Sequence, residues 1–490
     1  MKTPGLVVVM AVLAGGLASS LRGAAPIDLQ DRRELFVDRH LIERMDNVTL
    51  KLAQPRRAEV VLKFDRPWEY AAGFVSVLKD GDTYRLYHRG GSKDATGKYD
   101  DLAEITFYAE SRDGINWVKP ALNLPGLDPA KGANAILGIG KYRVSHNFAP
   151  LLDDRPGVPA AERYKAVGGK GPVGKPGGLY RYVSADGINW KVYSDVELFT
   201  GYALDSLNVL TWLPAEQCYA IYMRRWSEGG TPDQPKFKGI RSIARTTSKD
   251  FITWSKPEPM SFGDAPEEHL YTNNTKPYFR APHILVSMPF RFWPDRQAYP
   301  VEQQLAWGVS ASQTKGISDA VFMTSRGGMS YDRTFMESFI RPGLDELAWH
   351  ARETQPSNGI VQTGPAEMSF YIVNHYTLPT AYLTRYVLRL DGFASAHADY
   401  KPGTLLTKPL TFRGGKLVLN FSSSAAGSVQ VEVLGSDAKV LATSESLIGD
   451  AIERAVTWKG KFDLAALAGK SVQLRFTLKD ADVYALRFAP

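Results

Sequence analysis

The heptapeptide SRDGINW, Ser111–Trp117, places an Asp-Gly pair three residues before a tryptophan. Similar stretches return along the chain: SADGINW ends at Trp190, TSKDFITW at Trp254, SRGGMSY at Tyr331 and RLDGFAS at Ser395. Their centres, at positions 113, 186, 250, 327 and 391, are separated by 73, 64, 77 and 64 residues. The sequence therefore contains five copies of one unit, of which the fifth lacks the aromatic residue.

Each copy predicts a β-hairpin. An Asp-Gly pair between apolar runs is a strong hairpin signal, because glycine accepts the positive φ that the turn needs. Two further strand-like runs precede each motif, such as FVSVLKD and TYRLYHRG in the first unit. Four strands in this length correspond to one blade of a β-propeller. Because helical periodicity is almost absent, we predict an all-β chain in which residues 30–398 form a five-bladed β-propeller.

The pattern of polar and apolar residues changes after Tyr400. The runs KLVLNF, SVQVEVLG, SVQLRFTL and VYALRF alternate polar and apolar residues, as strands with one buried face do. We predict that residues 401–490 form a small C-terminal β-sandwich, with an accessory structural role favoured over sugar binding. The run LFVDRHLIE, Leu35–Glu43, is a candidate for the strand that closes the propeller ring.

The N-terminus has the layout of a secretory signal peptide. Lys2 is followed by the apolar run Leu6–Leu17 and by small residues up to Ala25. The apolar run is too short to span a bilayer comfortably. We therefore predict that residues 1–25 are removed and that the mature protein is secreted or periplasmic, with no membrane association.

The amino-acid composition limits the covalent links and the partners that we expect for this chain. Cys218 is the single cysteine and lies in an apolar run, so we expect no intrachain disulfide and a buried thiol. The net charge is +7, but the lysines and arginines are scattered along the chain. Without a basic stripe, nucleic acid is not an expected partner. The oligomeric state is left open.

Polar residues stand where the inner strand of each predicted blade begins. In a propeller these positions converge around a central funnel. Acids, amides, histidine and tryptophan are the mixture that sugar rings and hydroxyls require. The candidates, in the stretches DRPWEY, SHNF, ALDSLN, EEHLYTNN and NGIVQTG, are Trp68, Glu69, His146, Asn147, Asp205, Asn208, Glu268, Asn273, Asn274 and Gln362.

The repeated Ser-x-Asp-Gly-x-x-Trp hairpins, the export signal and the C-terminal β-sandwich together resemble the five-bladed-propeller glycoside hydrolases. That group includes the invertase-like and the arabinanase/β-xylosidase-like families. The phrases RELFVDRHLIE, Arg33–Glu43, and PYFRAPHI, Pro277–Ile284, more closely resemble a divergent set of bacterial secreted proteins with an invertase-type N-terminal domain. The likeness covers essentially the whole mature chain, and its motifs specify architecture better than activity.

The resemblance implies a pair of carboxyl groups across the scissile bond. One is protonated and donates to the leaving oxygen, and the other attacks or activates water. Acids on inner strands of different blades could serve, and the sequence offers Glu69, Asp205 and Glu268 as catalytic candidates. Each also has a structural interpretation, such as a turn or cap for Asp205. Glu104 and Asp319 open the third strands of their blades and are expected in structural pairs.

The sequence departs from the family signatures. It lacks the Asn-Asp-Pro-Asn-Gly and Arg-Asp-Pro motifs of invertase-type enzymes, and Arg280-Ala281-Pro282 stands where arabinanase-like enzymes carry Glu-Gly-Pro or Glu-Ala-Pro. Arginine cannot act as a general acid. We expect Arg280 and His283 to bind a charged or hydroxyl-rich substrate, or Arg280 to pair with an acid of a neighbouring blade. No metal-ligand spacing is present, so no cofactor is expected, although a structural calcium ion stays open.

The leading hypothesis is a secreted glycoside hydrolase that acts from the ends of a polysaccharide or oligosaccharide. The first alternative is a non-catalytic carbohydrate-binding or cell-surface interaction propeller, which the missing signatures favour. The second is a sialidase, whose hairpin motif has similar residues. That motif has an extra residue between Asp and Gly, and sialidases need an arginine triad that this sequence does not reveal. The sugar and the linkage are left open.

Overall fold

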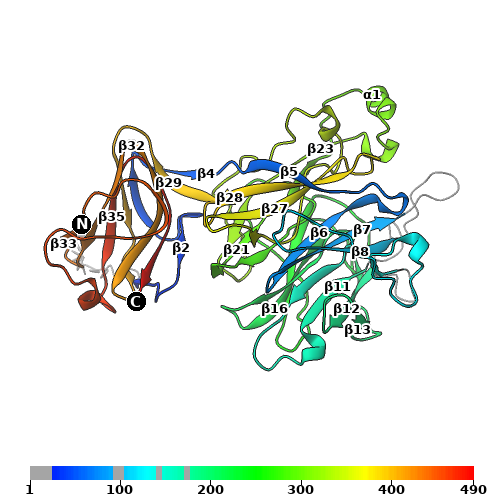
Figure 1. Ribbon diagram of the computed structural model, residues 1–490, viewed down its shortest axis with the longest axis horizontal. Coiled ribbons are helices and arrows are strands. Elements are labelled where there is room, and N and C mark those ends of the chain that lie inside the picture. The colour runs from blue at the N-terminus through cyan, green and yellow to red at the C-terminus, as the bar shows by residue number, and fades with distance from the viewer. Residues whose placement is uncertain (1–24, 92–103, 139–145, 170–176) are drawn as a thin grey trace, which may run out of the picture.

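The computed structural model describes residues 25–91, 104–138, 146–169 and 177–490. Nearly all of its regular elements are strands (Figure 1), so the predicted all-β class is confirmed. One α-helix, α1 (Val301–Ala306), occurs in these ranges, and no helix there is long and apolar enough to cross a membrane. The predicted signal peptide, residues 1–25, lies outside the described residues except for Ala25. Cys218 is buried, as expected.

A larger body contains the sheets of the repeated units (Figure 1). The first sheet consists of β6 (Tyr70–Asp80), β7 (Thr83–Gly91), β8 (Ile105–Ser111) and β9 (Ala135–Leu137). The second consists of β10 (Ala149–Leu152), β11 (Tyr164–Gly168), β12 (Gly177–Ser184), β13 (Lys191–Val192) and β14 (Leu198–Tyr202). The third consists of β15 (Val209–Leu213), β16 (Cys218–Trp226), β17 (Arg241–Ser248) and β18 (Glu258–Pro259).

The fourth unit is divided into two three-stranded sheets, and the fifth includes a strand from the N-terminal segment. The fourth consists of β19 (His269–Leu270), β22 (Phe290–Trp293) and β23 (Ile317–Ala320), and of β20 (Lys276–Tyr278), β21 (Ala281–Ser287) and β24 (Met323–Ser325). The fifth consists of β25 (Gln355–Pro356), β26 (Val361–Gln362), β27 (Glu367–Asn374), β28 (Tyr382–Arg389) and β5 (Arg56–Lys63).

The repeated motif is a capped turn rather than a two-residue hairpin loop. The Asp113 carboxylate accepts hydrogen bonds from the backbone N–H groups of Ile115 and Asn116, both at 2.8 Å, and the Trp117 indole donates to the Gly114 carbonyl at 3.2 Å. Gly114 has a φ of +73°, which favours glycine. The same bonds recur at residues 184–190. In the motif, the aspartate thus caps the turn and the tryptophan donates a hydrogen bond to it.

Every motif is also hydrogen-bonded to the preceding sheet. The bonds are Tyr371 hydroxyl to Gly114 carbonyl, Tyr87 hydroxyl to Gly187 carbonyl, Arg181 guanidinium to Phe251 carbonyl, Gly328 N–H to Glu216 carboxylate, and Asp391 N–H to Tyr278 hydroxyl. The first of these joins the last sheet to the first motif. The chain of bonds is therefore circular.

The inner strands complete this circle at its centre. β6 contacts β10 and β25, and β15 contacts β10 and β20. Asn274, just before β20, donates to the carbonyl of Pro356 in β25. The sheets are thus arranged around one axis, with the inner strands all beginning at one edge of the ring, the N-terminal edge. The count of five blades stays a prediction, because the fourth unit is split into two sheets.

The strand that closes the ring is β5, and not the run Leu35–Glu43. β5 pairs antiparallel with β28, with Lys63 opposite Tyr382 and Arg56 opposite Val387. The earlier run lies elsewhere because its apolar side chains are buried in the smaller body, where β2 (Glu34–Leu35) pairs with β35 (Gln473–Ala489). The sheets of the larger body therefore begin at Arg56 rather than at residue 30.

The smaller body contains a nine-stranded sheet. Besides β2 and β35, its strands are β3 (Ile42–Asp46), β4 (Thr49–Leu52), β29 (Ala394–Ala398), β30 (Gly403–Thr407), β32 (Lys416–Leu434), β33 (Val440–Thr443) and β34 (Asp450–Ala455). A separate pair joins β1 (Ile27–Asp28) to β31 (Leu410–Thr411). Residues before 53 and from 394 to 398 thus share strands with the predicted 401–490 unit, whose sandwich architecture stays a prediction.

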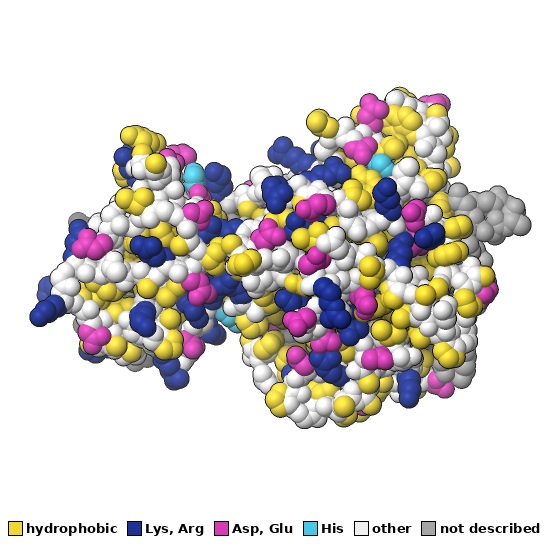
Figure 2. Space-filling view, viewed as in Figure 1, with side chains coloured by type: hydrophobic (Ala, Val, Ile, Leu, Met, Phe, Trp, Pro, Cys, Tyr) yellow, Lys and Arg dark blue, Asp and Glu magenta, His cyan; other side chains and the backbone are white. Residues whose placement is uncertain are grey.

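Charged side chains of both signs are interspersed over the face in Figure 2. No extended region of one sign is visible on this face of the larger body. This distribution fits the scattered charge of the sequence.

Candidate functional site

Several polar side chains meet at the N-terminal edge of the ring. His146 and Asn147 directly precede the inner strand β10, and Asp205 precedes the inner strand β15. Glu104 opens the third strand of the first sheet, and Arg89 lies near the end of β7, which runs antiparallel to β6. These five residues, which we call the mouth-side cluster, come together because strand starts and antiparallel strand ends share one edge.

A hydrogen-bonded chain runs from a buried acid to an exposed one. His146 Nδ1 lies 2.5 Å from Glu104 Oε2, and His146 Nε2 lies 3.0 Å from Asp205 Oδ1. The Glu104 and His146 side chains are 4% and 3% exposed, whereas that of Asp205 is 56% exposed. The imidazole is therefore fixed between two carboxyl groups, of which only Asp205 is open to solvent.

Arg89 orients Asn147 beside this chain. It donates from Nη1 to Asn147 Oδ1 at 3.0 Å, and the amide nitrogen of Asn147 lies 2.8 Å from His146 Nε2. His146 therefore contacts the Asn147 amide and both carboxyl groups, Glu104 through Nδ1 and Asp205 through Nε2.

Three arginines surround one tyrosine beside this chain. The Cζ atoms of Arg224, Arg241 and Arg352 lie 4.3, 5.3 and 5.6 Å from the ring centre of Tyr271. Tyr271 is buried and stacks on Phe290 with ring centres 4.6 Å apart. Burial favours the neutral phenol, but Arg352, Arg224 and Arg241 outweigh it, so the pKa of Tyr271 lies below its ordinary value.

Arg89 connects the two groups. Its Nη2 donates to the Tyr376 hydroxyl at 2.5 Å, and its guanidinium lies 4.4 Å from the ring centre of Phe74. Tyr376 and Asp205 both interact electrostatically with Arg352. The carboxyl chain and the three arginines therefore form one continuous site.

Two of the predicted catalytic acids lie apart from this arrangement, and their surroundings favour structural roles. Glu69 is buried and pairs with Lys119, with Oε1 2.6 Å from Nζ, while it also accepts from the backbone of Arg66. Burial raises the pKa of Glu69 against the opposing effect of Lys119. Glu268 pairs with Arg291 at 2.8 Å and with Arg333 at 2.7 Å.

Some predicted binding residues organise the backbone. Asn208 donates to the carbonyls of Leu204 and Ser206 and so holds the loop that carries Asp205. Asn273 donates to the carbonyl of Tyr222. Trp68 packs against the apolar cluster that contains Phe107.

Arg280 and His283 lie at the contact between the two bodies. Arg280 is 3.2 Å from Asp391 and 2.8 Å from Glu453, and His283 Nε2 is 2.7 Å from Glu34. Their expected substrate-binding role does not fit this position, because their partners belong to the interface.

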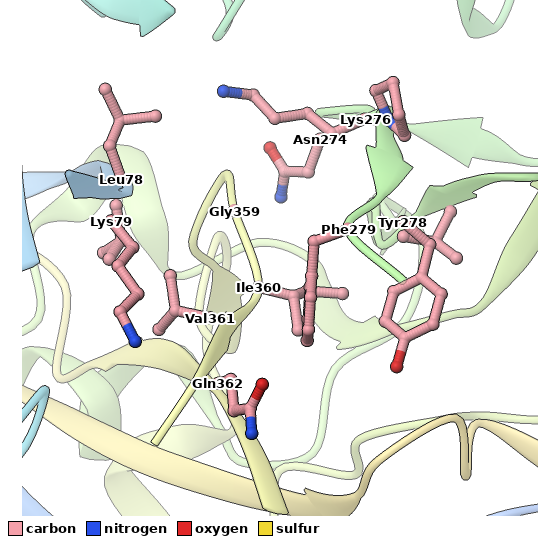
Figure 3. A pocket seen from close by; sticks show the side chains of 13 residues that line it. Leu78, Lys79, Asn274, Lys276, Tyr278, Phe279, Gly359, Ile360, Val361 and Gln362 are labelled. Atoms are coloured by element: carbon pink, nitrogen blue, oxygen red, sulfur yellow. The ribbon is translucent and has the colours of Figure 1, made fainter. Parts of the chain in front are cut away.

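Asn274 and Gln362 line a cavity between β6, β20 and β26 (Figure 3). Its volume is about 280 Å³, and Lys79, Lys276 and Phe279 also line it. Burial lowers the pKa of Lys276 to about 8. The last residues of β6 line this cavity, whereas the mouth-side cluster lies where β10 and β15 begin.

Glu104 belongs to the mouth-side cluster, although its place in the sequence predicts only a structural pair. The sequence patterns do not predict the other members of the site, Arg89, Arg224, Arg241, Arg352 and Tyr271. A signal was available for two of the arginines: Arg89 in LYHRG and Arg224 in IYMRR both lie near the end of a second strand. Such positions share an edge with the start of the inner strand. In the described ranges, no group of three or more His, Cys, Asp or Glu residues could hold a metal ion.

No protein-family model matches the sequence, and neither does any curated protein. Among solved structures, a glycoside hydrolase family 43 arabinoxylan arabinofuranohydrolase from Bacillus subtilis matches with a TM-score of 0.40 and 11% identity, over 86% of this chain and 96% of that one. A family 32 β-fructofuranosidase from Bombyx mori matches with a TM-score of 0.43 and 9% identity, over 89% and 95%.

An N-acetylgalactosamine deacetylase from F. plautii also matches, with a TM-score of 0.41 and 11% identity, over 70% of this chain and 96% of that one. The chain is thus similar to solved structures of glycoside hydrolases and of an enzyme of another activity, with TM-scores of 0.40 to 0.43.

Proposed function

We propose that this protein is a secreted glycoside hydrolase in which Asp205 is the general acid. The observation that carries the proposal is the position of Asp205, an exposed carboxyl group that contacts the buried pair of His146 and Glu104. A protonated carboxyl group that faces solvent can donate to the oxygen of a leaving sugar. We also propose that the enzyme acts on the ends of carbohydrate chains, because its inner strands surround a single axis.

Asp205 is assigned as the proton donor, and no residue is assigned as the second catalytic carboxylate. Among the described residues, Glu69 and Glu268 are engaged by Lys119 and by two arginines, and Glu104 is buried against His146. This observation favours a second candidate function, a non-catalytic carbohydrate-binding propeller. The two candidates differ in whether sugar is released.

The test is a release assay with aryl glycosides and with plant and algal polysaccharides. We expect Asp205→Asn to lower kcat by about a hundredfold or more on substrates with poor leaving groups, and much less on activated aryl glycosides, which need little protonation. Glu69→Gln and Asp154→Asn are the controls and should keep the turnover of the folded wild type. Asp154 is exposed and follows the end of β10, at the opposite edge.

Unchanged turnover of Asp205→Asn on poor leaving groups would remove Asp205 from the reaction. Binding of sugars by the wild type without release from any substrate would instead establish the binding module.

A further inference from the structure

Arg224, Arg241 and Arg352, which we call the arginine cluster, lie around the ring of Tyr271. None of the three forms an ion pair with a described carboxylate, and no hydrogen-bond acceptor lies near their Nε atoms. Arg224 donates to the backbone carbonyl of Tyr271, and Arg241 lies beside a nitrogen of His269. By contrast, Arg291, Arg326 and Arg385 of the same body each contact two carboxylates.

Without a ligand, this arrangement of buried guanidinium groups raises the free energy of the folded protein. Arg224 is only 5% exposed, and a buried charge needs a partner to offset its lost hydration. Burial, together with repulsion from Arg224 and Arg352, lowers the pKa of Arg241 to about 10. An anion among the three guanidinium groups would relieve this repulsion and satisfy their free N–H groups.

Asp205 is close to the arginine cluster but does not neutralise it. Its charge interacts with Arg241, Arg352 and Tyr271, and its Oδ1 lies 3.0 Å from His146 Nε2. A single carboxylate does not balance three guanidinium groups, so a further anion among them would be bound favourably.

We propose that the arginine cluster binds an oxyanion on the substrate, a carboxylate or a sulfate ester, so that the protein acts on acidic sugars. The inference rests on the proposed function for the reaction but not for the binding. Guanidinium groups match the planar edge of a carboxylate and the oxygens of a sulfate through paired N–H donors. The sequence suggested this chemistry for Arg280, which the interface acids already occupy.

The experiment measures affinity by calorimetry for the neutral, uronic and sulfated forms of galactose and glucose. We expect at least one acidic form to bind about tenfold or more tightly than its neutral parent, and the comparison of uronic with sulfated forms identifies the oxyanion. Arg241→Gln and Arg352→Gln should each weaken binding of the acidic form about tenfold or more relative to binding of its neutral parent.

Arg225→Gln is the matched control, because Arg225 neighbours Arg224 on β16 but points to the opposite face and bonds to nearby carbonyls. Its affinity for acidic sugars should equal that of the wild type. If the glutamine variants do not fold, a second measurement on the wild type takes the place of the variant experiment. It compares the thermal stabilisation by millimolar sulfate with that by chloride at equal ionic strength. The expected result is a saturable sulfate effect.

Equal affinity for neutral and acidic forms, or no affinity for any acidic form or for sulfate, would overturn the inference. Release of neutral sugars alone would contradict it while supporting the hydrolase. Tight binding of acidic sugars without release from any substrate would support the inference and refute the hydrolase.

Discussion

The surroundings of a carboxyl group decide its role in this protein. Asp205 is open to solvent and bonded to a histidine, whereas Glu69 and Glu268 are each held by buried or partly buried cations. A carboxylate in a buried ion pair is costly to move, because breaking the pair leaves an uncompensated charge. At the residue scale, the described partners of Glu69 and Glu268 favour a structural role, and the exposure of the Asp205 side chain is the property on which its proposed role depends.

The aspartate of the repeated motif should stabilise the fold through its cap. Burial opposes the ionisation of Asp113, but hydrogen bonds from Asn116, Ile115 and Ser111 outweigh it and place the pKa of Asp113 below its ordinary value. We expect Asp113→Ala to lower the free energy of unfolding by about 1 kcal/mol at pH 7 in urea denaturation.

The pH dependence of this loss follows from the sign of the shift. A carboxyl group with a lowered pKa stabilises the folded state above its ordinary pKa of 3.8, and the contribution disappears as the pH falls through the folded-state value. The difference between wild type and variant should therefore shrink below pH 4. Asp154→Ala is the control and should show neither effect; a loss independent of pH would contradict the cap.

At the scale of the element, the direction of each strand decides which residues meet. His146, Asn147 and Asp205 could be predicted because they stand at the starts of inner strands, where the repeat pattern places a funnel. Arg352 also precedes an inner strand, but a lone arginine in HARETQ carries no distinctive signal. The convergence of Arg224 and Arg241 depends on the pairing of β16 with β17, which joins residues of one sheet around Tyr271 of the next.

The closing strand β5 offers a test of the ring. Leu62 is 8% exposed and packs in one apolar cluster with Leu383 and Val373 of the last sheet. We expect Leu62→Ala to lower the free energy of unfolding by about 2 kcal/mol or more, because it leaves a cavity where the ring closes. The measurement is the urea unfolding of the larger body, followed by tryptophan fluorescence.

Val60→Ala is the matched control, since Val60 lies on the same strand and is 48% exposed. It should change stability by less than about 0.5 kcal/mol. Equal effects of the two substitutions would mean that β5 does not close a packed ring.

At the scale of the whole molecule, the fold depends on pairings between distant parts of the chain. β5 pairs with β28, and β2 pairs with β35, across most of the sequence length. Repeats within the sequence predicted the ring, because each motif specifies its own turn. They could not predict which N-terminal strand closes it, since β2 and β5 are both short apolar-polar runs and only the partner surface distinguishes them.

The same limit applies to the site. Local patterns identified Asp205, His146 and Asn147, but Glu104 and Arg89, which contact His146 and Asn147, belong to the first sheet. The interface acids Asp391 and Glu453 likewise explain why Arg280 is unavailable for substrate. Such partners become visible only when the ring brings separate sheets together.

The proposed site can be tested by a crystal structure of the Asp205→Asn variant with an acidic sugar that the wild type cleaves. We predict that the sugar lies at the N-terminal edge of the ring, with its leaving oxygen at hydrogen-bond distance from the side chain at position 205 and its oxyanion among Arg224, Arg241 and Arg352. Binding of the sugar in the cavity between β6, β20 and β26, or on the smaller body, would show that Asp205 and the arginine cluster do not form the substrate site.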